Sequence, residues 1–385
     1  MPRHSRLPIA LTFCIMTFTF ARTALAVDII WSDSNTDQIL RAPLDGSGPV
    51  VELYGSSDYP GAPSALSPRD VAVDGDYIYW ADFSTDQILR GPLDGSGPVT
   101  ALYDSLDGVS SAHGLAVQGG FLYWTAFPNE LIQRGSIDGT APVVDLFDLV
   151  DDDLGKPYDL AIDGDFLYWT GITGHILRGP LDGSGAVVEL FGVADLPGGS
   201  HYLRGIATDG EYVYWTDTAS DQILRGAIDG SGSVIELYNA ADHPGSPTNI
   251  SAYGIVANDD FLYWTDGGSD SILMAPADGS GPVTQLYTAS PFPNFLVIRD
   301  SAGDFDKNGD TDGNDFLAWL RGDSPNPLSA SDLAEWQANY GAESSLGVSL
   351  LVNGVTIPEP TSGLLLVFAM FTAFARQCPV LAQHH

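Results

Sequence analysis

Residues 77–103 read YIYWADFSTDQILRGPLDGSGPVTALY, and five further versions of this pattern lie along the 385-residue chain. A tryptophan marks each version, at Trp31, Trp80, Trp124, Trp169, Trp215 and Trp264. Successive tryptophans are 44 to 49 residues apart. A period of this length indicates one supersecondary unit that is repeated along the chain.

Each unit has the pattern of four short strands. In the second unit these are residues 70–74, 77–80, 87–90 and 99–103. The second strand is apolar on both faces, so we expect it to be buried on both sides. A tight reversal at Asp94-Gly95 separates the third strand from the fourth. Six such units predict an all-β fold, a six-bladed β-propeller of four-stranded blades over residues 27–300.

The ends of the repeat indicate how the ring closes. The first unit starts at Asp28, on its second strand, and so lacks a first strand. Residues 295–300 have the apolar pattern of a first strand and follow the sixth unit. We expect them to pair beside residues 28–31, which would remove an open sheet edge.

The motif residues resemble the YWTD repeat of low-density-lipoprotein-receptor class B propellers. The best copies are residues 214–217 and 263–266, and Ala126 and Gly171 replace the motif aspartate in two other units. The resemblance covers roughly residues 27–300. It implies the same six-bladed fold.

Residues that recur in every unit are expected to serve the blade itself. The tryptophans supply buried aromatic area, the aspartates form turns, and the arginines pair with carboxylates of neighbouring blades. Function is expected instead in the loops, which vary from unit to unit.

The longest variable loops lead from a fourth strand into the next first strand. Because first strands line the axis of a propeller, the residues that enter them should crowd around one mouth of the central channel. These rim residues are Arg69, His113, Tyr158, Arg204 and Tyr253. On an acidic protein they form a candidate site for an anionic or sugar-like ligand. The alternative is a satisfied loop network around ordered water.

Composition limits the partners. The chain has a formal net charge of −35. So acidic a surface repels nucleic acid and anionic lipid, and we expect no nucleic-acid partner. Residues 1–26 have the pattern of a secretory signal peptide, with a basic start, an apolar run and Ala24-Leu25-Ala26 before the predicted cleavage point. Of two cysteines, Cys14 lies in this signal and Cys378 near the far end, so the exported body has no disulfide.

Signals of catalysis are sparse. There is no nucleophile elbow, phosphate-cradling loop or zinc spacing. His175, His201 and His243 share no metal-like spacing, and His113 is the only rim histidine. We therefore favour a non-catalytic binding protein over an enzyme. The alternative is a secreted propeller hydrolase or lyase that acts on a carbohydrate or lactone.

Residues 301–341 form a separate acidic module. Its first loop has calcium-loop spacing, with Gly309 at the sharp turn and a helix expected from Phe316. The expected ligands are Asp304, Asp306, Asn308, Asp310 (through its carbonyl), Asp312 and Asp315. A partial second copy follows, in which Asp332 and Trp336 echo Asp315 and Trp319, and we expect its shorter loop, residues 323–332, to lack calcium. The pair resembles a dockerin module, which implies a cohesin-like partner.

The C-terminal region follows a linker at residues 342–356. In residues 357–385, Pro358-Glu359-Pro360 precedes an apolar segment and Arg376. This tail resembles a PEP-CTERM sorting signal, which implies processing by exosortase machinery at a bacterial envelope. A buried C-terminal strand is the alternative. The sequence as a whole predicts an exported cell-surface or extracellular-matrix protein that binds a protein or carbohydrate through its propeller loops.

Overall fold

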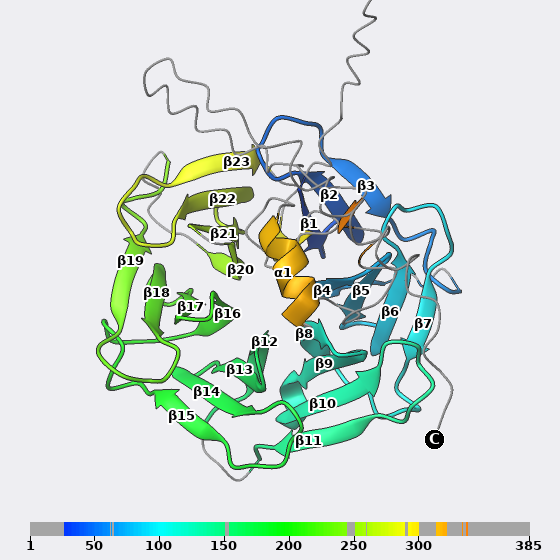
Figure 1. Cartoon of the computed structure of the whole chain (residues 1–385), viewed down its shortest axis with the longest axis horizontal. Coiled ribbons are helices and arrows are strands. Elements are labelled where there is room, and N and C mark those ends of the chain that lie inside the picture. The colour runs from blue at the N-terminus through cyan, green and yellow to red at the C-terminus, as the bar shows by residue number, and fades with distance from the viewer. Residues whose placement is uncertain are drawn as a thin grey trace, which may run out of the picture. The chain divides into compact units, whose positions relative to one another are not determined.

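The computed structural model describes residues 27–61, 63, 65–150, 154–244, 251–258, 260–288, 292–299 and 313–321, together with Leu333, Trp336 and Gln337. Within this part of the chain, six four-stranded antiparallel sheets surround one axis (Figure 1). The predicted all-β, six-bladed propeller is thus confirmed.

Each blade runs from an inner strand at the axis to an outer strand at the periphery. Blade 1 contains β24 (Pro293–Arg299), β1 (Asp28–Asp33), β2 (Gln38–Pro43) and β3 (Val51–Tyr54). Blade 2 contains β4 (Pro68–Asp74), β5 (Tyr77–Asp82), β6 (Gln87–Pro92) and β7 (Thr100–Tyr103). Blade 3 contains β8 (Ala112–Gln118), β9 (Phe121–Ala126), β10 (Leu131–Ser136) and β11 (Val144–Asp148), with the short 3-10 helix η1 (Phe127–Asn129) after β9. Blade 4 contains β12 (Pro157–Asp163), β13 (Phe166–Gly171), β14 (His175–Pro180) and β15 (Val188–Phe191). Blade 5 contains β16 (Leu203–Thr208), β17 (Tyr212–Asp217), β18 (Gln222–Ala227) and β19 (Ile235–Asn239). Blade 6 contains β20 (Ala252–Asn258), β21 (Phe261–Asp266), β22 (Ser271–Pro276) and β23 (Thr284–Thr288).

The ring closes as the sequence predicts. Strand β24 pairs antiparallel with β1, and Ile29 faces Ile298 while Trp31 faces Leu296. The last strand of the propeller therefore completes the first blade, and it covers the edge of β1 that would otherwise be unpaired.

Aromatic stacking between blades forms the core. Each repeated tryptophan is fully buried and lies against an aromatic ring from the outer strand of the preceding blade. Tyr54 and Trp80, for example, have ring centroids 5.4 Å apart, and Phe191 and Trp215 are 5.7 Å apart. A Cβ atom on Gly91 would lie 2.5 Å from the Tyr54 ring, so the glycine makes room for this packing.

A hydroxyl group that follows five of the six repeat tryptophans joins neighbouring inner strands. In blade 5, Thr216 Oγ1 accepts a hydrogen bond from Gly205 N at 2.9 Å and donates one to Tyr253 O of blade 6 at 2.8 Å. The residues at the same position in other blades are Ser32, Thr125, Thr170 and Thr265, which make equivalent contacts. Blade 2 has Ala81 there, so the seam between blades 2 and 3 lacks this donor.

The repeated arginines differ from the prediction. Arg178 stacks 4.6 Å from the Phe166 ring of its own blade, and three other repeat arginines do the same. The ion pair of Arg41 is with Asp28 of its own blade, at 3.7 Å. Across a seam, hydrogen bonds from Ser184 lower the pKa of Asp182, and Arg134 of the preceding blade adds a smaller attraction. Across the seams of the described propeller, Arg90 and Arg225 donate hydrogen bonds to the carbonyl groups of Ile137 and Ala277 in the next blade, where the sequence predicted pairing with carboxylates.

Beyond the propeller, the structure describes the helix α1 (Gly313–Arg321), which includes the helix expected from Phe316. Phe316 packs on Trp319 and Trp336, with ring centroids 5.5 Å and 4.9 Å away. Residues 304–312 of the expected calcium loop, the expected signal at 1–26, the linker and the tail lie outside the described residues. None of the described helices is long and apolar enough to cross a membrane.

Candidate functional site

The five rim residues occupy the same place in their blades. Each is the second residue of an inner strand, in β4, β8, β12, β16 or β20. In every blade a β-bulge interrupts the pairing of the inner strand at this point. A bulge re-aims side chains and is common next to functional sites. The sixth member of the ring is Asn294 in β24, which the sequence analysis missed.

His113 is enclosed by aromatic rings. Its ring lies 5.0 Å from Phe83, 4.9 Å from Phe127 and 4.7 Å from Tyr158. The residue is 5% exposed, and neither ring nitrogen has a hydrogen-bond partner. Burial, together with the charges of Arg69 and Arg204, lowers the pKa of His113 to about 3. The imidazole is therefore neutral at physiological pH.

Arg204 lies among three tyrosine rings. Its guanidinium carbon is 4.3 Å from the Tyr253 ring centroid, 4.8 Å from Tyr202 and 5.0 Å from Tyr158. One Nη atom also donates a hydrogen bond to the Tyr158 hydroxyl. Cation–π contacts on three sides hold the guanidinium in one orientation.

Arg69 shares the Phe83 ring with His113. Its guanidinium is 5.2 Å from the Phe83 ring. The ion pairs found among the described residues involve neither Arg69 nor Arg204. Both charges act on His113 and on Tyr158, so the five predicted rim residues do form one cluster.

Two buried carboxyl groups belong to the residues that directly follow two of the rim residues in the chain. Asp70 follows Arg69 and Asp159 follows Tyr158, and they are 6% and 3% exposed. Asp70 accepts a hydrogen bond from Leu115 N of blade 3 at 2.6 Å, and Asp159 accepts one from Ile206 N of blade 5 at 2.9 Å. Burial raises the pKa of both groups, and they hydrogen-bond to each other, which requires a shared proton.

The ring is filled at this depth. Gly114 lies between the two aspartates, and a Cβ atom there would be 2.6 Å from Asp159 Cα. Phe295 is fully buried, and its ring lies 6.0 Å from that of Tyr158 in the opposite blade. Closely packed residues therefore lie directly beneath the rim cluster.

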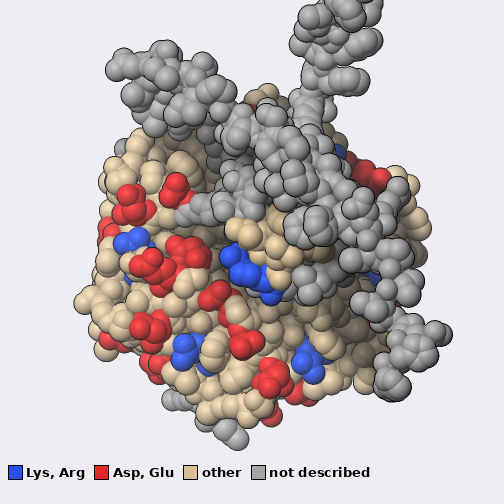
Figure 2. All heavy atoms as spheres, viewed as in Figure 1, with Lys and Arg blue, Asp and Glu red and all other residues tan. Residues whose placement is uncertain are grey.

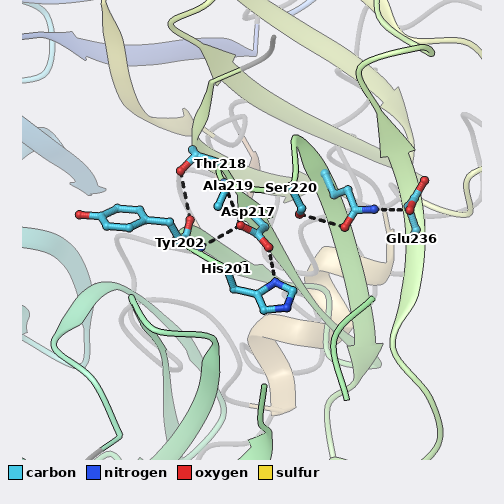
Figure 3. A network of polar contacts seen from close by, with 8 residues as sticks. His201, Tyr202, Asp217, Thr218, Ala219, Ser220 and Glu236 are labelled. Atoms are coloured by element: carbon cyan, nitrogen blue, oxygen red, sulfur yellow. Dashed lines mark hydrogen bonds and ion pairs between the residues drawn. The ribbon is translucent and has the colours of Figure 1, made fainter. Parts of the chain in front are cut away.

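A histidine–carboxylate pair lies just before Arg204 in the chain. His201 Nδ1 is 2.6 Å from Asp217 Oδ2 (Figure 3). Asp217 also accepts hydrogen bonds from the backbone N–H groups of Tyr202 and Ala219. Thr218 Oγ1 donates to Tyr202 O at 3.1 Å. The motif aspartate thus holds the loop that leads into the rim.

The other residues considered in the sequence analysis do not form a second site in the described part of the chain. His243 hydrogen-bonds to Asn239 O at 2.9 Å and accepts one from Trp264 Nε1 at 3.3 Å, so it serves the core. The described residues contain no group of three metal-ligating side chains placed to hold an ion. The expected calcium ligands at 304–312 lie outside the described residues, and Asp315 is described only as part of α1.

Three aromatic side chains of the cluster escaped the sequence analysis. Phe83 and Phe127 each come three residues after a repeat tryptophan, and Tyr202 comes two residues before Arg204. The position three residues after the tryptophan holds five different residue types in the six units: Ser34, Phe83, Phe127, Ile172, Thr218 and Gly267. That variability was the available signal.

Comparison with known proteins places the fold. No protein-family model and no curated protein matches the sequence. A chain of the nidogen/laminin complex is similar at 18% identity with a TM-score of 0.58, over 71% of this chain and 98% of that chain. A catalytically inactive virginiamycin B lyase from Staphylococcus aureus, solved with quinupristin, is similar at 16% identity and a TM-score of 0.50, over 68% and 80% of the two chains. A gluconolactonase from Xanthomonas campestris is similar at 16% identity and a TM-score of 0.50, over 71% and 91%.

At these identities the similarity concerns the fold alone. The propeller resembles YWTD-type propellers, and the same architecture occurs in binding proteins and in lyases and lactonases. Function must therefore be argued from the residues at the rim.

Proposed function

We propose that this protein is an exported binding protein that holds its ligand at the rim cluster without transforming it. The ligand contacts would come from the half-buried side chains Arg69, Arg204, Tyr202 and Tyr253. The variable loops around them would add specificity, as loops on a rigid scaffold usually do.

The observation that carries this proposal is the state of His113. A general base works best with a pKa near the working pH and with a second group that orients it. His113 has a pKa of about 3 and packs against carbon-rich rings. A neutral, immobilised imidazole of this kind favours binding over proton transfer.

A catalytic role is the second candidate, because lyases and lactonases share the fold. The Asp70–Asp159 pair holds a proton at neutral pH, as an acid–base group would. However, both carboxyl groups are buried, and each also accepts backbone hydrogen bonds. They fit a structural role better than attack on a substrate.

Export and anchoring complete the proposal and rest on the sequence. The signal at residues 1–26 would export the chain, and the tail at 357–385 would deliver it to the cell surface through exosortase processing. The acidic loop at 304–315 would bind Ca²⁺ and stabilise the module that contains α1. A cohesin-like domain is the partner that the dockerin resemblance implies.

A ligand screen with simultaneous detection of products tests the proposal. We expect soluble saccharides or metabolites to bind the full chain and to be recovered unchanged. Turnover that disappears in a folded His113→Ala variant would support the enzyme instead. Binding that survives changes at Arg204 and Tyr253 would place the ligand elsewhere.

A further inference from the structure

We propose that the rim cluster selects a small carboxylic acid carried on a ring, and that Arg69 and Arg204 bind its carboxylate. This inference rests on the proposed binding function and names the ligand class. It is carried by the charge, the packing and the partners of the two arginines.

The first step is the isolation of the two positive charges. The chain has 50 acidic and 15 basic residues, so an arginine meets carboxylates more often than other cations. Arg69 and Arg204 nevertheless form none of the ion pairs found in the described part of the chain. Arg69 instead lies 5.2 Å from one aromatic ring, and Arg204 lies 4.3 to 5.0 Å from three.

The second step is what this environment leaves available. Arg204 uses one Nη atom on the Tyr158 hydroxyl, while the Nε atoms of both arginines are buried without a partner. Both side chains are half-buried, and the buried atoms without a partner include neither arginine's Nη atoms. A carboxylate is the group that matches the paired donors of a guanidinium.

The third step concerns size. A net charge of −35 repels a polyanion before it reaches the surface. Figure 2 shows acidic side chains spread over the blades in view, with few basic ones between them. A small monoacid experiences far less of this repulsion, so we infer a small ligand rather than an acidic polymer.

The fourth step concerns the rest of the ligand. Tyr202 and Tyr253 are half-buried, and their rings lie 4.8 Å and 4.3 Å from the guanidinium carbon of Arg204. His113 adds no charge, because it stays neutral. An apolar ring surface beside a cation fits a carboxylate attached to a sugar or other ring.

Calorimetric titration of the full chain with glucuronate and with glucose tests the inference, because the two probes share a ring and differ in the carboxylate. We expect glucuronate to bind at least about tenfold more tightly than glucose, as for a charged hydrogen-bonded group. Arg69→Gln and Arg204→Gln should each remove most of that preference. Arg178→Gln is the matched control, since it also stacks on a ring but lies away from the rim, and it should change nothing.

Three outcomes decide. Equal affinity for the two probes, or a preference that survives both rim variants, overturns the inference. If a neutral ligand from the screen binds and is lost in Tyr253→Ala, the inference fails while the proposed binding function stands. If a rim variant no longer melts cooperatively, Arg204→Lys is used in its place. Tenfold selectivity for glucuronate in that variant supports recognition of the carboxylate by a positive charge. Equal affinity for the two probes contradicts it.

Discussion

At the scale of single residues, the hydroxyl group after five of the six repeat tryptophans has a structural role that the repeat alone does not reveal. Thr216 bridges a buried N–H of blade 5 and a C=O of blade 6. Such a group satisfies two strands at once, which accounts for the threonine in the motif. Ala81 is the exception, and there Asp70 reaches across the same seam to Leu115.

We expect Thr216→Val to lower the free energy of unfolding by about 1–3 kcal/mol, because it leaves a buried donor and acceptor unsatisfied. Thermal unfolding measures this directly. Thr216→Ser is the control, since it keeps the hydroxyl, and it should lose clearly less. Equal losses in the two variants would mean that packing of the methyl group matters more than the bridge.

The buried carboxyl pair predicts a pH dependence of stability. Burial raises the pKa of Asp70 and that of Asp159, to about 7 for the latter, against about 3.9 in an unfolded chain. Between these values the folded state binds more protons than the unfolded state. The contribution of the pair is therefore full below about pH 4 and falls as pH rises through about 7.

Asp70→Asn should flatten this fall, because an amide donates to Asp159 without a titratable proton. Urea unfolding from pH 5 to pH 8 gives the slope, which is up to about 1.4 kcal/mol per pH unit for one proton. Asp74→Asn is the comparison, since the pKa of Asp74 is also raised by burial but no carboxyl partner is involved. Parallel curves for wild type and Asp70→Asn would contradict a shared proton.

Two rim groups beside the pair have pKa values shifted away from this pH range. The charged or titratable groups on the inner strands packed around the pair include Arg69, His113, Tyr158, Asp163, Arg204, Tyr253 and Arg299. Of these, the pKa of His113 is lowered to about 3 and that of Tyr158 is raised above its usual value of about 10. Neither shift moves a group into the window between pH 5 and pH 8.

At the scale of elements, β24 is the strand that closes the ring. Deletion of residues 295–300 should expose the edge of β1 and give an aggregation-prone protein. Size-exclusion chromatography and thermal melting would check this against a truncation that removes only residues 301–385. A soluble deletion variant that melts cooperatively would argue against the closure.

The module that contains α1 provides a second test at this scale. If the loop at 304–315 binds calcium, adding a chelator to the full chain should lower the helicity and the melting temperature of that module. Asp304→Ala with Asp312→Ala should mimic the chelator and make the protein insensitive to it. Unchanged circular dichroism and melting after chelation would remove the metal assignment.

The sequence predicted the elements well because each blade offers the same environment to the same residues. Trp80 and Trp215 are buried in equivalent seams, so the strand assignment made for one unit applies to the others. Asn294 was missed because its blade is assembled from both ends of the repeat, which hides its alignment with Arg69. The Asp70–Asp159 contact joins two blades that are not neighbours, and no local pattern contains that information.

At the scale of the whole molecule, the propeller is a scaffold that accepts more than one function. Its fold neighbours include a chain of a nidogen/laminin complex as well as a lyase and a gluconolactonase. The rim of this strongly acidic chain has two arginines without a described ion-pair partner and a neutral histidine. These residues all lie at the rim. The proposed binding function therefore requires that a ligand contacts the propeller there.

Hydrogen–deuterium exchange of the full chain, with and without a ligand from the screen, tests this most directly. The account predicts protection confined to the segments around the rim, at residues 67–70, 111–114, 156–159, 201–205 and 251–254. The Asp-Gly turns at the periphery, such as Asp94-Gly95, should exchange as before. Protection at those turns, or a ligand that leaves the rim segments unchanged, would contradict the account.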